Sequence, residues 1–217
     1  MALRYTLICD GSSDTALLPI LDWLLNTNGV TNDIQSEWAD LSRLRPGQTQ
    51  KLDSKICWGL KLYPCDLLFI HRDAEREPRE NRINEVNNAI QKAAQQVQMV
   101  PPVCVIPVRM TEAWLLFDEA SIRQASGNPN GSGSLSLPAI SDLEGLPDPK
   151  DILYSLLKQA SGLNMRRLKA FYVAERARRV TRYIKDFSPL RSLPAFAALE
   201  SDLRNVIVQS MWRNPSI

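Results

Sequence analysis

Short apolar runs alternate with longer amphipathic segments along the first 125 residues of the chain. The runs are bounded by turn residues, as β-strands are, and lie at residues 4–10, 34–41, 66–70 and 103–108. The run at 34–41 is the most polar and is expected at an edge of the sheet. The segments between the runs predict helices at residues 14–25, 49–60, 80–98 and 111–123. This alternation of strands and helices predicts an α/β fold with a mostly parallel sheet flanked by helices.

The second part of the chain has a different composition. Gly, Ser, Asn and Pro dominate residues 126–147, which is typical of a flexible linker. Helices are predicted beyond it, at residues 151–159, 165–184 and 194–211. We therefore predict three parts: an α/β domain at 1–125, a linker at 126–147, and a basic helical extension at 148–217 that packs on the first domain.

Acidic residues directly follow two of the predicted buried strands. The first apolar run ends in Asp10-Gly11-Ser12-Ser13-Asp14, and the run at 66–70 ends in His71-Arg72-Asp73-Ala74-Glu75. Open α/β sheets place their sites outside the carboxyl ends of the strands. Carboxylates gathered there repel one another unless a cation lies among them, and oxygen ligands suit Mg²⁺ or Mn²⁺. The sequence therefore predicts metal-dependent phosphate chemistry.

Each of these acids also has a plainer interpretation. Asp14 falls in the first turn of a predicted helix, where capping alone could explain an acid. Asp73 and Glu75 would lie on one side of an extended segment and could hold one or two metals, or they could belong to an exposed loop of mixed charge. Glu112 opens the helix after the third buried run and could be an ordinary N-terminal acid. His71 could bind substrate or could simply be hydrogen-bonded without a chemical role.

Charge is distributed unevenly, although the formal net charge is only +2. Residues 1–149 carry 13 Lys and Arg against 19 Asp and Glu, a net −6, whereas residues 150–217 carry 13 against 5, a net +8. A basic half beside an acidic site suits a polyanion such as DNA or RNA. A solvated helical face, or a surface for an acidic partner protein, is the alternative. The candidate nucleic-acid-binding residues are Arg166, Arg167, Lys169, Arg178, Arg179 and Arg182.

Lys150 is the candidate cation of the active site. It follows Pro147-Asp148-Pro149, which fixes the backbone just before a predicted helix, so that it could neutralise a scissile phosphate. Lys169 is the alternative, and an exposed lysine without a role is the plainer interpretation.

Several classes of protein are disfavoured by composition. The four cysteines have no C-x-x-C spacing and the chain has one histidine, so neither a structural zinc site nor disulfides are expected. No run of 18 apolar residues and no signal peptide are visible, so we expect a cytoplasmic protein without membrane contact.

These motifs resemble a TOPRIM-type domain. The resemblance rests on Asp10-Gly11-x-x-Asp14, Asp73-x-Glu75 and Thr111-Glu112-Ala113-Trp114-Leu115-Leu116, and covers about residues 4–120; Asp148-Pro149-Lys150 extends it to about 150. More narrowly, the chain is similar to small stand-alone TOPRIM-like proteins that are often encoded beside ATPases in bacterial phage-defence loci, and to the nuclease half of the overcoming-lysogenization-defect nucleases.

The resemblance implies a role for each acid. Asp10 would replace the usual Glu after the first strand, and Asp14 would be the second acid of that turn. Asp73 and Glu75 would coordinate Mg²⁺, Glu112 would complete the site, and Lys150 would be the cationic stabiliser. Asp10 is one methylene shorter than Glu and Glu75 one longer than Asp, and a misplacement of about 1 Å can cost roughly 10²-fold in rate.

The expected function is a metal-dependent nuclease acting on DNA or RNA, the effector of an ATPase-associated anti-phage system, with a partner ATPase and a possible homodimer implied by the resemblance alone. In this reading the metal ligands are Asp10, Asp73, Glu75 and Glu112. A catalytically silent scaffold or sensor that binds the ATPase or a phage component is the alternative. A phosphatase with Asp10 as nucleophile is a third reading.

Overall fold

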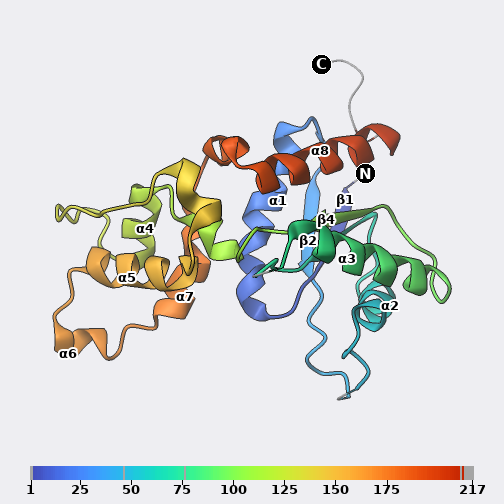
Figure 1. The fold of residues 1–217 in the computed structure, drawn as a ribbon, viewed down its shortest axis with the longest axis horizontal. Coiled ribbons are helices and arrows are strands. Elements are labelled where there is room, and N and C mark those ends of the chain that lie inside the picture. The colour runs from blue at the N-terminus through green and yellow to red at the C-terminus, as the bar shows by residue number, and fades with distance from the viewer. Residues whose placement is uncertain (1, 46, 76, 211, 213–217) are drawn as a thin grey trace.

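A four-stranded parallel sheet forms the centre of the protein in the computed structural model, which describes residues 2–45, 47–75, 77–210 and 212. The strands are β1 (Leu3–Ile8), β2 (Ile34–Trp38), β3 (Leu67–His71) and β4 (Pro102–Val105), in the order β2-β1-β3-β4. All three pairings are parallel, so the predicted α/β class with a parallel sheet flanked by helices is confirmed (Figure 1).

The strand order places a topological switch point between β1 and β3. The chain leaves β1 toward β2 on one side and later returns to build β3 and β4 on the other. Ile8 at the end of β1 is in register with Ile70 near the end of β3, so the residues that follow both strands leave the sheet at the same edge. Sites in open α/β sheets form at such a point.

Burial follows the pleat of the sheet. Leu7 and Phe69 belong to the core on one face, and Ile8 and Ile70 to the core on the other, because successive side chains of a strand point to opposite faces. β3 is buried along its whole length, whereas the three central residues of β2 are exposed, as expected of an edge strand.

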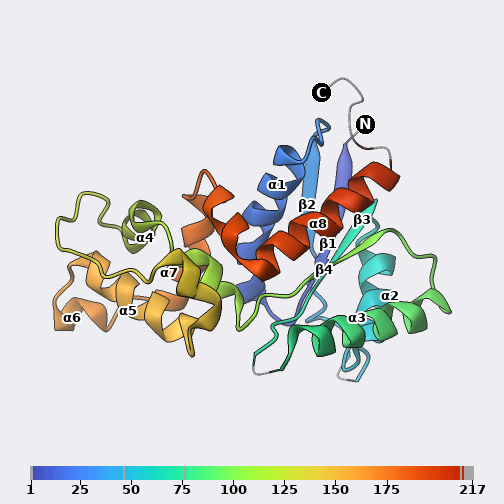
Figure 2. The ribbon, with the colours of Figure 1, turned by 45° about the horizontal axis from the view of Figure 1, so that its top comes forward.

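Helices cover both faces of the sheet. Helices α1 (Leu18–Thr27) and α8 (Pro194–Gln209) pack on one face, and α2 (Leu52–Leu62) and α3 (Arg79–Ala94) on the other (Figure 2). The predicted first helix is composite: Ser12–Leu17 forms a 3₁₀ turn, and the α-helix starts where Pro19 stands in its first turn. Proline is tolerated there because the first N–H groups of a helix have no partner within it.

The remaining helices form a lobe beside the sheet. It contains α4 (Glu119–Ser126), α5 (Pro149–Ser161), α6 (Met165–Leu168) and α7 (Val173–Arg179). Short 3₁₀ turns connect these elements, and they lie at Thr111–Leu115, Ile140–Gly145, Val180–Arg182 and Ser188–Ser192. One core cluster extends from the sheet into this lobe, so the hydrophobic core continues on both sides of the predicted linker. Within that segment Leu135 and Leu143 are buried.

Two predicted helices are wrong in their extent. The helix expected at 111–123 is a 3₁₀ turn followed by α4, because Asp118 is extended and its side chain accepts a hydrogen bond from the N–H of Ser121 to begin a new helix. The helix expected at 165–184 is interrupted between α6 and α7, where Phe171 turns inward to pack against the core. Among the residues described, no helix is both long and apolar enough to cross a membrane.

Candidate active site

Asp14 approaches the switch point from the turn after β1. It lies in the 3₁₀ turn Ser12–Leu17, and its carboxylate accepts hydrogen bonds from the N–H of Gly11 at 3.2 Å and from the Ser13 hydroxyl at 3.1 Å. These bonds cap the turn, as the plainer interpretation proposed. They also hold the carboxylate beside the end of β3, so the capping role and a role in a site are compatible.

Asp73 is the most perturbed carboxylate of this region. Its pKa is raised to about 7, first by burial and then by the charges of Asp14 and Glu112, against the N–H of Thr111, which donates to Asp73 Oδ1 at 3.2 Å and lowers it. Asp14, Asp73 and Glu112 come from three segments far apart in the chain. The structure therefore brings together carboxylates that repel one another in a partly buried corner.

His71, the last residue of β3, lies directly beneath these acids. The side chain is 2% exposed, and its Nδ1 lies 3.0 Å from the carbonyl oxygen of Val105. Burial lowers the pKa of the imidazole, against the charge of Asp14, which raises it. Nε2 lies 3.4 Å from Asp73 Oδ1 and 3.9 Å from Asp14 Oδ2, so a neutral ring presents its second nitrogen to the acids.

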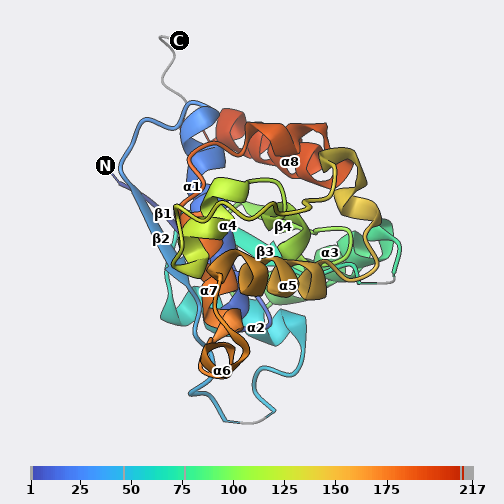
Figure 3. The same ribbon diagram turned by 90° about the vertical axis from the view of Figure 1, so that its left-hand side faces the viewer.

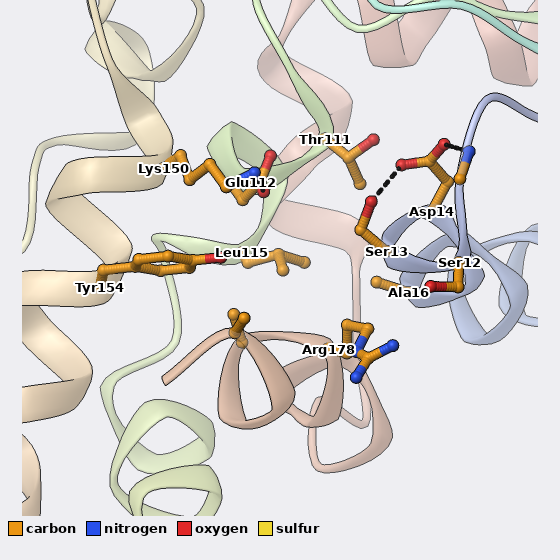
Figure 4. A pocket seen from close by; sticks show the side chains of 13 residues that line it. Ser12, Ser13, Asp14, Ala16, Thr111, Glu112, Leu115, Lys150, Tyr154 and Arg178 are labelled. Carbon is orange, nitrogen blue, oxygen red and sulfur yellow. Dashed lines mark hydrogen bonds and ion pairs between the residues drawn. The ribbon is translucent and has the colours of Figure 1, made fainter. Parts of the chain in front are cut away.

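A cavity of about 410 Å³ opens beside the acids, between the 3₁₀ turns of the sheet domain and the helical lobe. Asp14 lines it from the turn after β1 and Glu112 from the turn after β4, and Lys150, Tyr154 and Arg178 reach it from α5 and α7; Glu112 lies beside Lys150, with Asp14 across the cavity (Figure 4). Lys150 Nζ lies 3.7 Å from Glu112 Oε1 and also sits over the Tyr154 ring. Two cations and two acids thus line one cavity, with Lys150 paired to Glu112, an arrangement suited to a phosphate group bound beside a metal ion.

Asp10 is placed differently from its expected role. Its carboxylate is 51% exposed, pairs with Lys55 Nζ at 2.6 Å and with the guanidinium of Arg72, and does not line the cavity. Burial alone would raise the pKa of Asp10, but the hydrogen bond and charge of Lys55, with the charge of Arg72, hold it below its ordinary value. Lys55 on α2 and Arg72, which follows β3, therefore already neutralise Asp10, the acid that the sequence motif placed first in the site.

Glu75 also stands apart from the cavity. Its backbone is left-handed, with φ of 55°, so Asp73 and Glu75 do not share one side of an extended segment as their spacing predicted. The side chain is 68% exposed and lies 3.9 Å from Arg82. Its charge still contributes to the raised pKa of Asp73. Glu75 is thus a neighbour of the site rather than a member of it.

The predicted basic residues separate into two groups. Arg178, Arg179 and Arg182 line a second cavity of about 490 Å³, and Arg178 lines both cavities. Arg166, Arg167 and Lys169 are exposed on and just after α6, at the far end of the lobe, and line neither cavity (Figure 3). Lys150 rather than Lys169 is therefore the lysine that faces the acids.

In the part of the chain that the structure describes, no group of three or more His, Cys, Asp or Glu side chains is placed to hold a metal ion. Comparison with protein-family models, with curated proteins and with solved structures finds no significant match. The resemblance to TOPRIM-type domains therefore stays a prediction.

Proposed function

We propose that the chain is a metal-dependent nuclease whose site is the corner formed by Asp14, Asp73 and Glu112. The observation that carries this proposal is the gathering of three carboxylates at the switch point of a parallel sheet, where burial, and then the charges of Asp14 and Glu112, raise the pKa of Asp73 to about 7. Such crowding costs free energy in the isolated protein, and a divalent cation would offset it.

The donors of this corner fit Mg²⁺ or Mn²⁺ in kind, because they are carboxylate oxygens. We propose Asp14 and Asp73 as the ligands, with Glu112 at the rim of the site. A bound divalent cation would polarise the phosphoryl oxygen and lower the pKa of a bound water. The ligand set differs from the one expected from the motif, since Asp10 and Glu75 have cationic partners of their own.

The cavity supplies the rest of the site. Lys150 and Arg178 face the acids from the helical lobe and would bind the non-bridging oxygens of a phosphodiester. Arg178 has no ion pair with any described carboxylate, so its charge remains open to a ligand. Arg179 and Arg182 continue the basic surface into the neighbouring cavity, which favours a polymer over a single nucleotide.

The test is cleavage of plasmid DNA, single-stranded DNA and tRNA by the purified chain in Mg²⁺, Mn²⁺ or EDTA. We expect cutting that needs the metal and falls by at least about 10²-fold in Asp73→Asn, because the ligand loses its charge. Asp202→Asn is the matched control: Asp202 is an exposed acid on α8, outside both cavities, and its variant should cut as the parent does.

Loss of cutting in both variants would point to misfolding, and unchanged cutting in both to a contaminating nuclease, rather than to this site. Absence of cutting by the parent chain, alone and with the ATPase that the resemblance implies, would overturn the proposal. The alternative of a scaffold or sensor subunit that binds such an ATPase would then stand.

A further inference from the structure

A third cavity lies on the other side of the turn that follows β1. Its volume is about 480 Å³, and its lining includes Trp38 at the end of β2, Asp40 just beyond that strand, and Lys55 from α2. Gly11 and Ser12 line both this cavity and the cavity of about 410 Å³ at the candidate active site. The Trp38 cavity is therefore a direct neighbour of the active-site cavity.

Three cavities thus adjoin one another in series. Arg178 is shared by the basic cavity of about 490 Å³ and the active-site cavity, and Gly11 and Ser12 are shared by the active-site cavity and the Trp38 cavity. Gly11 has no side chain, and the nearest atom that a Cβ built on it would meet is Ser13 Oγ, at 3.8 Å. A strand bound in the active-site cavity can therefore continue over Gly11 without meeting a side chain of that residue.

Trp38 is placed to contact a ligand rather than to fill the core. It is half-buried at the carboxyl end of an edge strand, and among the residues described it packs against neither hydrophobic cluster. Within the same described part of the chain, its ring stacks on no other ring and on no cation. A large aromatic side chain that lines a cavity in this way is suited to stack on a planar ligand such as a nucleobase.

The charges of this cavity suit a base better than a phosphate. Asp10 and Asp40 both line it, and both would repel a phosphate. Lys55 Nζ donates to Asp10 Oδ1 at 2.6 Å, so its charge is already compensated, although an ammonium keeps further N–H groups for a neutral acceptor. Carboxylates accept hydrogen bonds from the exocyclic amino groups of bases. The phosphates of a strand are therefore expected in the two neighbouring cavities, where the other cations lie.

We propose that this cavity binds one unpaired nucleobase of the substrate strand, stacked on Trp38, while an adjoining phosphate lies in the active-site cavity. The inference rests on the proposed function and deepens it, because it names the substrate class: a single strand, or an unpaired segment of a folded RNA. A base inside a duplex is stacked and paired, and it would first have to be extruded. A free nucleotide has the same chemistry, but the shared wall of the two cavities favours a base of the bound polymer.

Fluorescence anisotropy with a labelled single-stranded oligonucleotide, and with the same sequence as a duplex, tests the proposal in Ca²⁺, which prevents cutting. We expect the parent chain to bind the single strand more tightly than the duplex. Trp38→Ala should weaken binding of the single strand at least about fivefold and leave binding of the duplex unchanged, whereas Trp38→Phe should keep most of the affinity. Trp58→Ala is the matched control, because Trp58 is a half-buried tryptophan on α2 that lines none of the three cavities.

Two further measurements locate the base. Strands that carry one abasic nucleotide, at each position in turn, should lose affinity for the parent chain at one position and for Trp38→Ala at none, since both changes remove the same contact. A strand with 5-iodouracil at that position should photo-crosslink to the peptide that contains Trp38. The crosslink is measured on the parent chain, so a failure of Trp38→Ala to fold would not affect the conclusion.

The possible failures are distinguishable. Metal-dependent cutting, with no crosslink at Trp38 and no effect of Trp38→Ala on the single strand, would overturn the base site and leave the nuclease proposal intact. A nucleoside monophosphate whose binding depends on Trp38, beside an oligonucleotide whose binding does not, would also overturn it, because the cavity would then take a free nucleotide. Binding of the strand that depends on Trp38 without any cutting would support the base site and count against the nuclease. A chain that neither binds nor cuts nucleic acid would overturn both.

Discussion

Two aspartates at neighbouring strand ends have opposite electrostatic surroundings. Asp73 faces the acids Asp14 and Glu112, and its pKa is raised to about 7; Asp10 faces Lys55 and Arg72, and its pKa is lowered. Both follow a buried strand and both were candidates for the same role. Their partners decide between them, since a cation binds where negative charge is not yet compensated.

Replacing Asp73 by Asn should stabilise the metal-free protein at alkaline pH. The folded protein holds a proton on Asp73 up to about pH 7, whereas an unfolded Asp loses it near its ordinary pKa of 3.8. The folded state therefore binds more protons between these values, and the stability of the parent protein falls as pH rises through this window. A shift of this size corresponds to at most about 4 kcal/mol. Solvent around a partly exposed side chain reduces the expected gain to about 1–2 kcal/mol, or roughly 2–8 °C in Tm.

The measurement is thermal unfolding of parent and Asp73→Asn in EDTA at pH 5 and pH 8. The variant should melt higher at pH 8, the two should approach each other at pH 5, and added Mn²⁺ should stabilise only the parent. Asp10→Asn is the matched control and should have the opposite sign, since its charge is stabilising above its unfolded pKa and that benefit disappears as pH falls through its lowered folded pKa. A lower Tm for Asp73→Asn at both pH values would contradict the conclusion that the charge of Asp73 destabilises the metal-free protein.

At the level of single elements, Asp118 decides where the fourth helix begins. Its carboxylate accepts hydrogen bonds from the N–H of Ser121 at 3.2 Å and from the Ser121 hydroxyl at 2.7 Å. The apolar pattern continues through Trp114, Leu115 and Phe117, so periodicity alone joins two elements that the cap separates. The break directs the chain from the site into the helical lobe.

Asp118→Ala should therefore lower the free energy of unfolding by about 1 kcal/mol, or roughly 2–4 °C in Tm, because the first turn of α4 loses its cap. Asp118→Asn keeps an oxygen that can accept the Ser121 N–H and should lose much less. Thermal unfolding of both variants checks this. Equal losses in the two would show that the negative charge, and not the cap, is what α4 needs.

The whole molecule joins an acidic sheet edge to a basic helical lobe. The cavity between them takes its acids from the turns after β1 and β4 and its cations from α5 and α7. The path of the chain makes this possible: it leaves the sheet after β4, builds the lobe, and returns with α8 to cover the sheet again. The acidic and basic halves of the sequence thus both contribute side chains to one cavity.

Arg178 connects the two cavities, so its loss should weaken binding of nucleic acid along the whole surface. We expect Arg178→Ala to reduce affinity several-fold and to make the dependence of log K on log salt concentration shallower by about 1, as for one lost phosphate contact. Arg166→Ala, on α6 and outside both cavities, is the matched control and should change neither value. Fluorescence anisotropy with a labelled oligonucleotide at several salt concentrations, in Ca²⁺ to prevent cutting, measures both. Equal effects of the two variants would argue for a diffuse basic surface without a path through Arg178.

The sequence by itself determined the sheet and the carboxyl edge at which the candidate site lies. The run that ends at Ile70 is apolar on both faces, and the run that ends at Ile8 is buried on both apart from Arg4, a pattern that buried parallel strands need whatever surrounds them. The exposed centre of β2 was likewise visible in the sequence, because this run is more polar than the others. Acids that follow strands β1, β3 and β4 within a few residues emerge at the carboxyl edge, so Asp14, Asp73 and Glu112 were within reach of prediction.

Only the tertiary structure decided which of these acids share the site. Asp10 was set aside by Lys55, 45 positions away, and by Arg72, 62 positions away, and no local pattern encodes such pairs. Glu75 was turned outward by one left-handed residue, and His71 was oriented by a carbonyl group on the next strand. The direction of a side chain and the charge of its neighbours depend on packing between distant segments, whereas the position of a strand depends on its own residues.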